Sequence, residues 1–290
     1  SYALGGTLLR ASGAPAAGYV VVKDEKIVSV VATKAEVPAG TPIVETGGII
    51  SPGLMDLHNH IAYNFIPVWN SGKRFSNRYQ WARLSAYGPA IKNPYNAVKA
   101  KNQCQAIKYG ELRAIVGGTT TIQGSVDLAC ARSLVRNVEF VNFCEDHIRQ
   151  NVLPINGIDQ TDAAGLNKQF ASGATRAFLV HLAEGIDDSS RNEFEQLRQR
   201  DLLKPQVVGI HSTALTEAQI NEMGKIGMKI VWSPLSNLIL YGKTTNIPAA
   251  LKAGNAIAKA TIQITRAGTG KVEEYELTFT PESEQQDKEA

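Results

Sequence analysis

The chain has 290 residues, of which 43% are hydrophobic and 20% charged, and its 30 basic and 27 acidic side chains give a net charge of +3. This length suits one large domain, or a large domain with a small one. The basic residues form no tract, which argues against nucleic acid as a partner. No apolar run approaches the roughly 18 residues of a membrane-spanning helix, so a membrane role is not expected.

The cysteines bear on the cellular compartment. Cys104, Cys130 and Cys144 are an odd number and lack the spacing of a metal site. We therefore expect reduced thiols in a cytoplasmic protein. The first residues also lack the charged and then apolar pattern of a secretory signal, which favours the same location.

Residues 1–48 have the alternation of short strands. In "GYVVVKDEKIVSVVA", a charged turn at Lys23–Lys26 joins two β-branched runs, which predicts a small antiparallel sheet. Near the other end, "ATIQIT" and "EYELTF" predict a hairpin, and residues 256–282 are candidates to complete a small β-sandwich with the first strands. Residues 283–290 are expected to be a polar, disordered tail.

Residues 49–255 have a different pattern, in which apolar strand-like runs alternate with helical stretches. The runs include "GGTTTIQGS", "RAFLVHLAEG", "QVVGIHS" and "MKIVWSPLSN". Between the last two, "LTEAQINEMGKIG" has helical spacing and a glycine stop after Ile226. Strands alternating with helices indicate parallel βαβ units, and their number suggests an α/β barrel or a doubly wound sheet.

Two of the five histidines are placed one residue apart in "PGLMDLHNH". Residues i and i+2 of a strand point to the same side, so His58 and His60 can converge on one metal ion. The alternative is a pair of polar histidines at a strand end without a ligand. His147, in the polar stretch "EDHIRQN", is expected to lie on the surface.

The stretch "PGLMDLHNH" closely resembles the first-strand motif of the metal-dependent amidohydrolase superfamily. "VGGTTTIQG", "FLVHLAEG", "VVGIHS" and "VWSPLSN" resemble its second, fifth, sixth and seventh strands, in the family's order. The His-x-x-Glu spacing is similar to the branch of cytosine, guanine and triazine deaminases, whereas the carbamylated-lysine branch fits less well. The resemblance implies a (β/α)8 TIM-like barrel over residues 49–255.

The resemblance also implies roles for individual residues. His58, His60 and His181 would hold one divalent metal ion, with zinc as the first choice and iron as the alternative. Glu184 would carry a proton from water to the leaving nitrogen, and His211 would polarise the water or bind the developing oxyanion. Each has a structural alternative: a histidine at the end of an apolar run is often a satisfied core residue, and Glu184 could begin a helix.

An aromatic segment, "YNFIPVWNSGKRFSNRYQWARLSAYG", follows the first two histidines. Loops after barrel strands form the mouth of the active site, so this segment predicts a pocket for a flat or hydrophobic small molecule. The alternative is a surface flap that buries its own aromatic rings. Its basic side chains, Arg78 among them, either meet an acidic substrate group or face solvent. The residues expected to line the pocket are Tyr63, Trp69, Trp81, Ser236 and Asn237.

One feature departs from the family. Its members carry a metal-binding aspartate at the end of the eighth strand, but here the only aspartate after Asp201 is Asp287, in the polar tail. The barrel is therefore expected to be incomplete at its C-terminal end, with much of the eighth strand missing. Either the complete enzyme has its aspartate outside this sequence, which we favour, or the protein is shortened and has an open barrel.

Together these features predict a metal-dependent hydrolase that acts on a C–N bond, either a deaminase or an amidohydrolase. The alternative is a catalytically inactive scaffold or binding protein that lacks the eighth-strand aspartate. A dinucleotide-binding oxidoreductase is disfavoured, because no Gly-x-Gly-x-x-Gly follows the first strand. A homo-oligomer is compatible with the resemblance, although no residue pattern fixes one.

Overall fold

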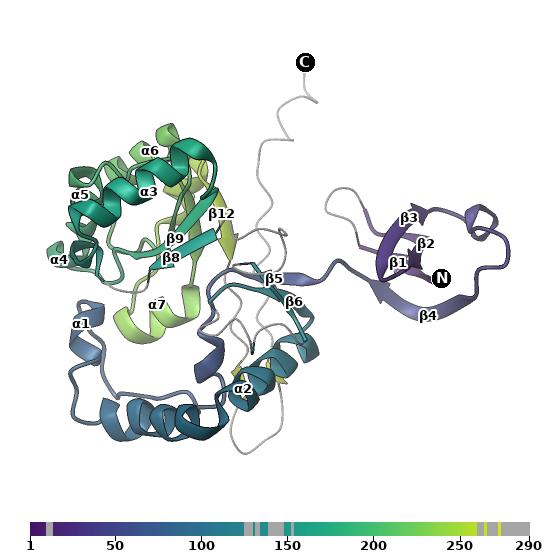
Figure 1. Ribbon diagram of the computed structural model, residues 1–290, viewed down its shortest axis with the longest axis horizontal. Helices are drawn as coiled ribbons and strands as arrows, with labels where there is room; N and C mark the ends of the chain where they lie inside the picture. Colours follow the sequence, from purple (N-terminus) through teal and green to yellow (C-terminus); the bar gives the residue numbers. More distant parts are fainter. Residues whose placement is uncertain are drawn as a thin grey trace. The chain divides into compact units, whose positions relative to one another are not determined.

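The computed structural model describes residues 1–9, 14–124, 130, 134–138, 148–151, 154–259, 264–265 and 272–273. The chain divides into two compact units, Ser1–Leu54 and Met55–Ala290 (Figure 1). His147, Cys144 and the predicted polar tail at 283–290 lie outside the described residues.

The smaller unit contains a four-stranded sheet in the order β3-β2-β1-β4. The predicted antiparallel pairing across the turn is confirmed, because β2 and β3 pair antiparallel with Lys23 opposite Lys26. The expectation of a wholly antiparallel sheet is wrong, because β1 pairs in parallel with β4. Its small core contains Ala3, Val21 and Val37. The described strands form one sheet, so the β-sandwich remains a prediction. The strands are β1 (Tyr2–Leu8), β2 (Ala16–Lys23), β3 (Lys26–Val31) and β4 (Ile43–Ile50), with a 3-10 turn η1 (Lys34–Glu36) before β4.

The larger unit holds strands that follow one another in sequence order across two sheets. One sheet has the order β5-β6-β7, and the other has the order β12-β11-β10-β9-β8 with every pair parallel. A (β/α)8 barrel requires this order, but the described residues do not pair β7 with β8 or β12 with β5, so closure remains a prediction. The strands are β5 (Leu54–Asp56), β6 (Thr119–Ile122), β7 (Arg136–Asn137), β8 (Ile148–Asn151), β9 (Ala177–Leu182), β10 (Val207–His211), β11 (Lys229–Trp232) and β12 (Ala256–Lys259).

The C-terminal end of the larger sheet differs from the expectation in one respect. Residues 256–259 were candidates for the small sheet, and the eighth strand was expected to be largely missing. They instead form β12, which pairs in parallel with β11 and extends the larger sheet. Further on, β13 (Ile264–Thr265) and β14 (Val272–Glu273) pair antiparallel. Strand β13 lies in the expected strand "ATIQIT", whereas β14 lies just before "EYELTF", in the segment expected to connect the two strands. The strand is thus present, whereas the aspartate is not.

The helices begin and end at residues that the sequence signals. Helix α6 (Glu217–Ile226) is capped by the Thr216 side chain and ends at Gly227, whose φ of 83° is left-handed. Helix α3 (Gln160–Ser172) is likewise capped by Asp159 and ends at Gly173. The other helical elements are η2 (Ile61–Tyr63), α1 (Arg78–Trp81), η3 (Gly88–Lys92), α2 (Asn93–Val116), η4 (Ile155–Gly157), α4 (Asp188–Arg191), α5 (Glu193–Gln199), α7 (Pro234–Tyr241) and α8 (Ile247–Lys252).

The main core lies between the five-stranded sheet and the helices α3, α5 and α6, which gather on one side of it in Figure 1. Phe178, Val180 and Leu182 of β9 belong to this core. The alternate residue Leu179 belongs to a second cluster with residues of β10 and β11. Since side chains alternate along a strand, His181 is placed on the side of Leu179, away from the helices.

The expectation of three reduced thiols is wrong for two of the cysteines. Cys104, in α2, and Cys130 form a disulfide with a Cα–Cα distance of 4.9 Å. The two cysteines are 26 positions apart, and the sequence gave no sign of this pairing, because it depends on how α2 packs against Cys130. Disulfides persist mainly in oxidising compartments, so the thiol argument for a cytoplasmic location no longer holds.

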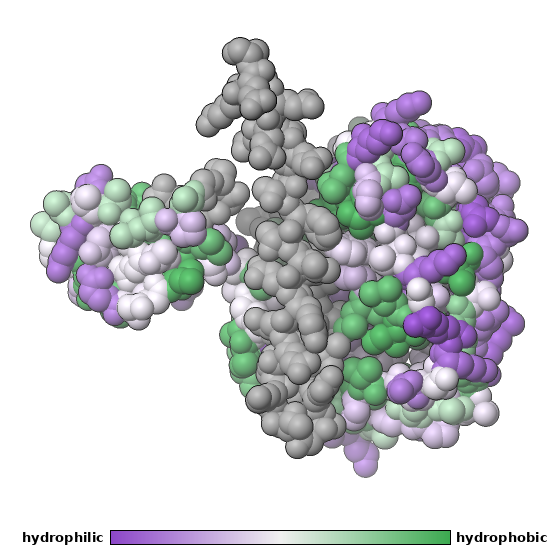
Figure 2. Space-filling view, turned by 180° about the vertical axis from the view of Figure 1, so that it is seen from behind, coloured by the Kyte–Doolittle hydropathy of each residue, from purple (hydrophilic) through white to green (hydrophobic). Residues whose placement is uncertain are grey.

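Apolar side chains are exposed among polar ones on the face seen in Figure 2. In the smaller unit, the most exposed large apolar side chains are Ile27 and Ile49, at 68% and 73%. Among the described residues, no helix combines the length and the hydropathy needed to cross a bilayer.

Candidate active site

Four histidines of the larger unit meet where β5, β9 and β10 end. The ring centroid of His58 lies 5.2, 4.9 and 4.7 Å from those of His60, His181 and His211, respectively. Glu184 lies beside them, with Oε2 3.5 Å from Nε2 of His211. The structure therefore brings together all five residues for which the sequence suggested metal-binding or catalytic roles.

Unusual backbone conformations shape these strand ends. Ala183, between His181 and Glu184, has a φ of 51°, and His211 and Ser212 have φ values of 69° and 55°. Left-handed conformations cost roughly 1–3 kcal/mol for residues other than glycine and cluster at functional sites. They end the regular alternation of β9 and β10, so that Glu184 and His211 come to face each other.

The donor atoms fit a divalent cation. Nε2 of His58 and Nε2 of His181 lie 3.1 Å apart. Nitrogens bound to one tetrahedral zinc at about 2.0–2.1 Å are roughly 3.4 Å from each other, which is close to this spacing. Two sets of ligand atoms each fall within 4.8 Å of one another: His58, His60 and His181, and His181, Glu184 and His211. Imidazole and carboxylate donors are the ligands that zinc prefers.

The second ring nitrogens of two histidines are anchored by polar side chains. Nδ1 of His58 is 2.6 Å from the Ser233 hydroxyl, and Nδ1 of His211 is 2.7 Å from Oδ1 of Asn237. Such contacts fix the ring orientation of ligand histidines. Burial, followed by the neighbouring imidazoles, lowers the pKa of His58 well below its usual value, so the ring is neutral and able to bind a cation.

A cavity of about 480 Å³ opens onto the histidines and Glu184. Of the predicted pocket residues, Trp81 and Ser236 line it, whereas Asn237 is fully buried behind His211. Trp69 lines neither this cavity nor the one described next, and it packs against Tyr87 with ring centroids 5.8 Å apart. The other lining residues are His58, His60, Arg78, Tyr79, Ala82, Arg83, Pro154, His181, Glu184, His211 and Leu240.

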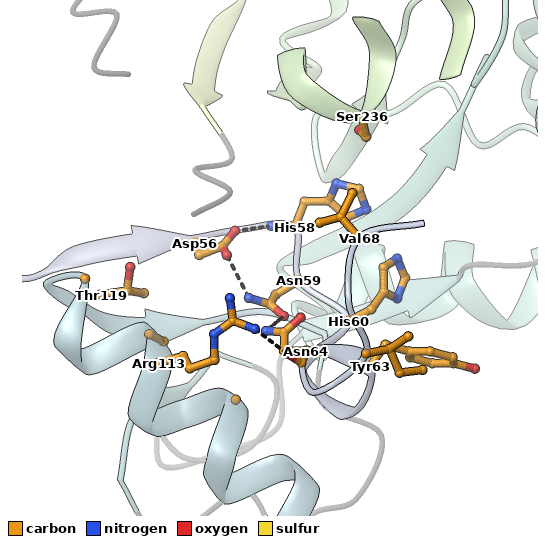
Figure 3. A pocket seen from close by; sticks show the side chains of 14 residues that line it. Asp56, His58, Asn59, His60, Tyr63, Asn64, Val68, Arg113, Thr119 and Ser236 are labelled. Carbon is orange, nitrogen blue, oxygen red and sulfur yellow. Dashed lines mark hydrogen bonds between the residues drawn. The ribbon is translucent and has the colours of Figure 1, made fainter. Parts of the chain in front are cut away.

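A second cavity, of about 280 Å³, adjoins His58 and His60 and is lined by Tyr63, another predicted pocket residue (Figure 3). Asp56 is buried there and accepts hydrogen bonds from the His58 amide and from Nδ2 of Asn59. Burial raises the pKa of the Asp56 carboxyl to about 6. Tyr63 stacks on Tyr95 with ring centroids 4.0 Å apart, so this ring is held by packing within the unit.

The sequence did not reveal the residues that surround Glu184. The Tyr241 hydroxyl donates to Oε1 of Glu184 at 2.7 Å, and Nη1 of Arg78 lies 3.8 Å from Oε2. Arg78 is only 7% exposed, and its Nη2 lies 3.6 Å from Oε1 of buried Glu193. The expectation that Arg78 faces solvent is wrong, because the side chain is buried between two carboxylates at the wall of the cavity. Contact with an acidic substrate group stays a prediction.

Strand β12, at which the sequence resemblance led us to look for an aspartate, has no carboxylate among the described residues. Strand β12 reads Ala-Ile-Ala-Lys, and Lys259 is the register partner of Trp232. The next residue after Trp232 is Ser233, whose hydroxyl contacts His58. The site therefore consists of three candidate histidine ligands together with His211 and Glu184. The described part of β12 adds no carboxylate ligand to it.

Solved structures with a similar fold are hydrolases, a deaminase among them. A triazine hydrolase from Arthrobacter aurescens is 13% identical with a TM-score of 0.67, covering 89% of this chain and 71% of its own. A zinc-bound adenosine deaminase from Xanthomonas campestris is 14% identical with a TM-score of 0.60, covering 89% and 68%. N-isopropylammelide isopropylaminohydrolase from Burkholderia multivorans is 17% identical with a TM-score of 0.59, covering 90% and 74%.

No protein-family model matches the chain, and no curated protein matches it by sequence. At these low identities, the solved structures establish the fold. The chain thus has an α/β fold that is similar to those of triazine hydrolase, adenosine deaminase and isopropylaminohydrolase.

Proposed function

We propose that this protein is a metal-dependent hydrolase of the amidohydrolase superfamily that acts on a C–N bond, by deamination of a heterocycle or by opening of an amide-like bond. The observation that carries the proposal is the convergence of His58, His60, His181 and His211 with Glu184 at the ends of β5, β9 and β10. The hydrolases and the deaminase of similar fold support it, as does the His-x-x-Glu spacing of the deaminase branch.

Each site residue has a task in this proposal. His58, His60 and His181 would hold one divalent ion, with zinc as the first choice and iron as the alternative. When bound, such an ion lowers the pKa of water towards neutral and so supplies the nucleophile. Glu184 takes a proton from the attacking water and delivers it to the leaving nitrogen. His211, oriented by Asn237, stabilises the negative charge that develops on the substrate.

The substrate proposed is a small, flat molecule. Trp81 and Tyr79 supply aromatic walls to the cavity of about 480 Å³, and Leu240 adds an apolar one. Cavities of this size and lining suit a drug-sized or smaller organic ligand. The zinc-loaded protein should therefore be tested for ammonia release from cytosine, guanine, adenosine and amino-triazines, and for hydrolysis of N-acyl compounds.

The decisive variant in that assay is Glu184→Gln, which keeps the shape of the side chain and removes the proton acceptor. We expect zinc to be retained and turnover to fall by about 10²–10⁴-fold, the usual contribution of a general acid–base group. Glu217→Gln, an exposed glutamate in the first turn of α6, is the matched control and should leave turnover unchanged. Undiminished turnover in Glu184→Gln would rule out the proton-transfer role.

A second candidate is favoured by one observation, the absence of a carboxylate from the described part of β12. The chain would then be an inactive scaffold or binding protein. Physical chemistry gives such a scaffold no reason to keep four histidines and Glu184 within reach of one ion. Zinc binding without turnover of any compound in the panel would favour the scaffold over the enzyme.

A further inference from the structure

We propose that Arg78 is a positioning residue, which holds the Glu184 carboxylate in the orientation needed for proton transfer. The inference rests on the proposed function. The Arg78 guanidinium lies between the carboxylates of Glu184 and Glu193, and all three side chains are at most 7% exposed. Buried charges are retained at a high cost in desolvation unless each one is paired.

The Arg78 guanidinium also lies beside Glu193, and hydrogen bonds fix the carboxylate of Glu193 in place. Glu193 accepts a hydrogen bond from the Tyr79 hydroxyl at 2.5 Å and one from the Ala183 amide at 2.7 Å. The second of these hydrogen bonds holds Ala183, the residue with a left-handed conformation that directly precedes Glu184. Glu193 therefore contacts both Arg78 and the backbone of the turn that carries Glu184. A planar guanidinium can contact both carboxylates at once.

The backbone reinforces the same contact. Asn77 and Gly185 form an antiparallel bridge, in which the Arg78 amide donates to the Glu184 carbonyl at 3.2 Å and the Ile186 amide donates to the Ser76 carbonyl at 2.7 Å. The Asn77 side chain also donates to Asp187 at 2.6 Å. The segment that carries Arg78 is thus attached directly to the residues around Glu184.

The opposite side of the carboxylate is fixed by α7. Tyr241 donates to Oε1 of Glu184 and accepts from Nε1 of Trp81 at 3.1 Å. Oε1 is thereby occupied, while Oε2 faces both Arg78 and His211. Arg78 and Trp81, both in the aromatic segment 63–88, therefore help to hold Glu184 in addition to lining the cavity.

The test compares Arg78→Gln, Arg78→Lys and the control Arg198→Gln. Arg198 also bridges two carboxylates, Glu195 and Glu222, but it does so on the surface. We expect Arg78→Gln to lower kcat at least about tenfold with KM changed less than about threefold, because a misplaced catalytic group costs rate rather than binding. Arg78→Lys should recover part of kcat, and Arg198→Gln should match the wild type.

A double-mutant cycle tells whether Arg78 acts through Glu184. In the Glu184→Gln background, Arg78→Gln should change the residual kcat by less than about twofold, since the group that it positions is already gone. Equal losses in both backgrounds would overturn the inference. So would a rise in KM with kcat unchanged, which would make Arg78 a substrate contact instead.

Amide hydrogen exchange of the zinc-free, substrate-free protein supplies a readout that is independent of activity. Peptides covering residues 76–81 and 183–187 should exchange at least about threefold faster in Arg78→Gln than in Arg198→Gln, because two buried carboxylates lose their common partner. Unchanged exchange would refute the inference whatever the activity. Circular dichroism and zinc content verify folding. If Arg78→Gln does not fold, Glu193→Gln and Arg78→Lys provide the same comparisons.

The two proposals fail in different ways. If Glu184→Gln keeps full turnover, the proton-transfer role fails and the inference about Arg78 fails with it. If Glu184→Gln is inactive and Arg78→Gln has wild-type kcat, the proposed function stands and only the positioning role is refuted.

Discussion

Nε2 of His58 and Nε2 of His181 lie 3.1 Å apart, although the two residues are 123 positions apart in the sequence. Two ring nitrogens held this close, with further imidazoles beside them, form a site in which a cation would be bound more tightly by the folded than by the unfolded chain. Binding to the folded state raises stability by RT ln(1 + [L]/Kd).

We therefore expect zinc to raise the free energy of unfolding, by about 2.7 kcal/mol when free zinc is 100 times its Kd. Urea unfolding with and without zinc measures this, and chelation should reverse it. His181→Ala should abolish the gain. An equal zinc effect in that variant would show that the ion binds elsewhere.

Gly185 is needed for the close approach of the segment that carries Arg78. A Cβ at this position would lie 2.5 Å from the Ser76 carbonyl oxygen and 2.8 Å from Cα of Asn77. We expect Gly185→Ala to destabilise the protein by about 2 kcal/mol in urea unfolding, as overpacking does. The control is Gly165→Ala in α3, which meets nothing within 4 Å and should be neutral or stabilising. Equal stability of the two variants would contradict the close approach.

The pH dependence of stability should carry a contribution from Glu193. Burial, opposed by Arg78 and Tyr79, raises the pKa of its carboxyl above the usual 4.5, and Glu184 raises it further. A raised folded-state pKa gives stability that is fully present below pH 4.5 and is lost as the pH rises through the folded pKa.

Glu193→Gln cannot ionise, so the variant lacks this loss. Between pH 4 and 7, its free energy of unfolding should therefore improve relative to that of the wild type as the pH rises. Urea titrations of both proteins across this interval measure the difference. If the difference in free energy of unfolding between the two proteins is constant with pH, or changes in the opposite direction, burial does not raise the pKa of the Glu193 carboxyl.

The disulfide gives a prediction for thiol counting. When protein purified without reductant is unfolded, one of the three cysteines should react as a free thiol, because Cys104 and Cys130 are bonded. Reduction should lower the free energy of unfolding by about 3.5 kcal/mol, since the bond closes a loop between residues 26 positions apart. Three reactive thiols before reduction would restore the expectation of reduced cysteines.

The sequence predicted the parts of this molecule that depend on local patterns. The hairpin at Lys23–Lys26 and the helix ending at Gly227 follow from turn and cap residues that lie within a few positions of each other. Local patterns were sufficient for these two features. The spacing of His58 and His60 only made a shared ligand possible, and the metal-binding roles of His58, His60 and His181 were predicted from the resemblance of their motifs to the amidohydrolase superfamily.

The contacts around Glu184 could not be predicted in this way. Arg78, Glu193 and Tyr241 come from three elements, and nothing near Arg78 in the sequence distinguishes it from a solvent-facing arginine. The same holds for the bond between Cys104 and Cys130, which depends on the packing of α2. These contacts form only when distant segments pack together, so the spacing of residues along the chain does not predict them.

The most direct test of the metal-dependent hydrolase is native mass spectrometry of the chain after incubation with zinc and removal of the excess. The account predicts one zinc ion per chain in the wild type and in Glu184→Gln, and its loss in His58→Ala and His181→Ala. A folded wild-type chain that carries no zinc, or variants that keep it, would contradict a metal centre formed by these histidines.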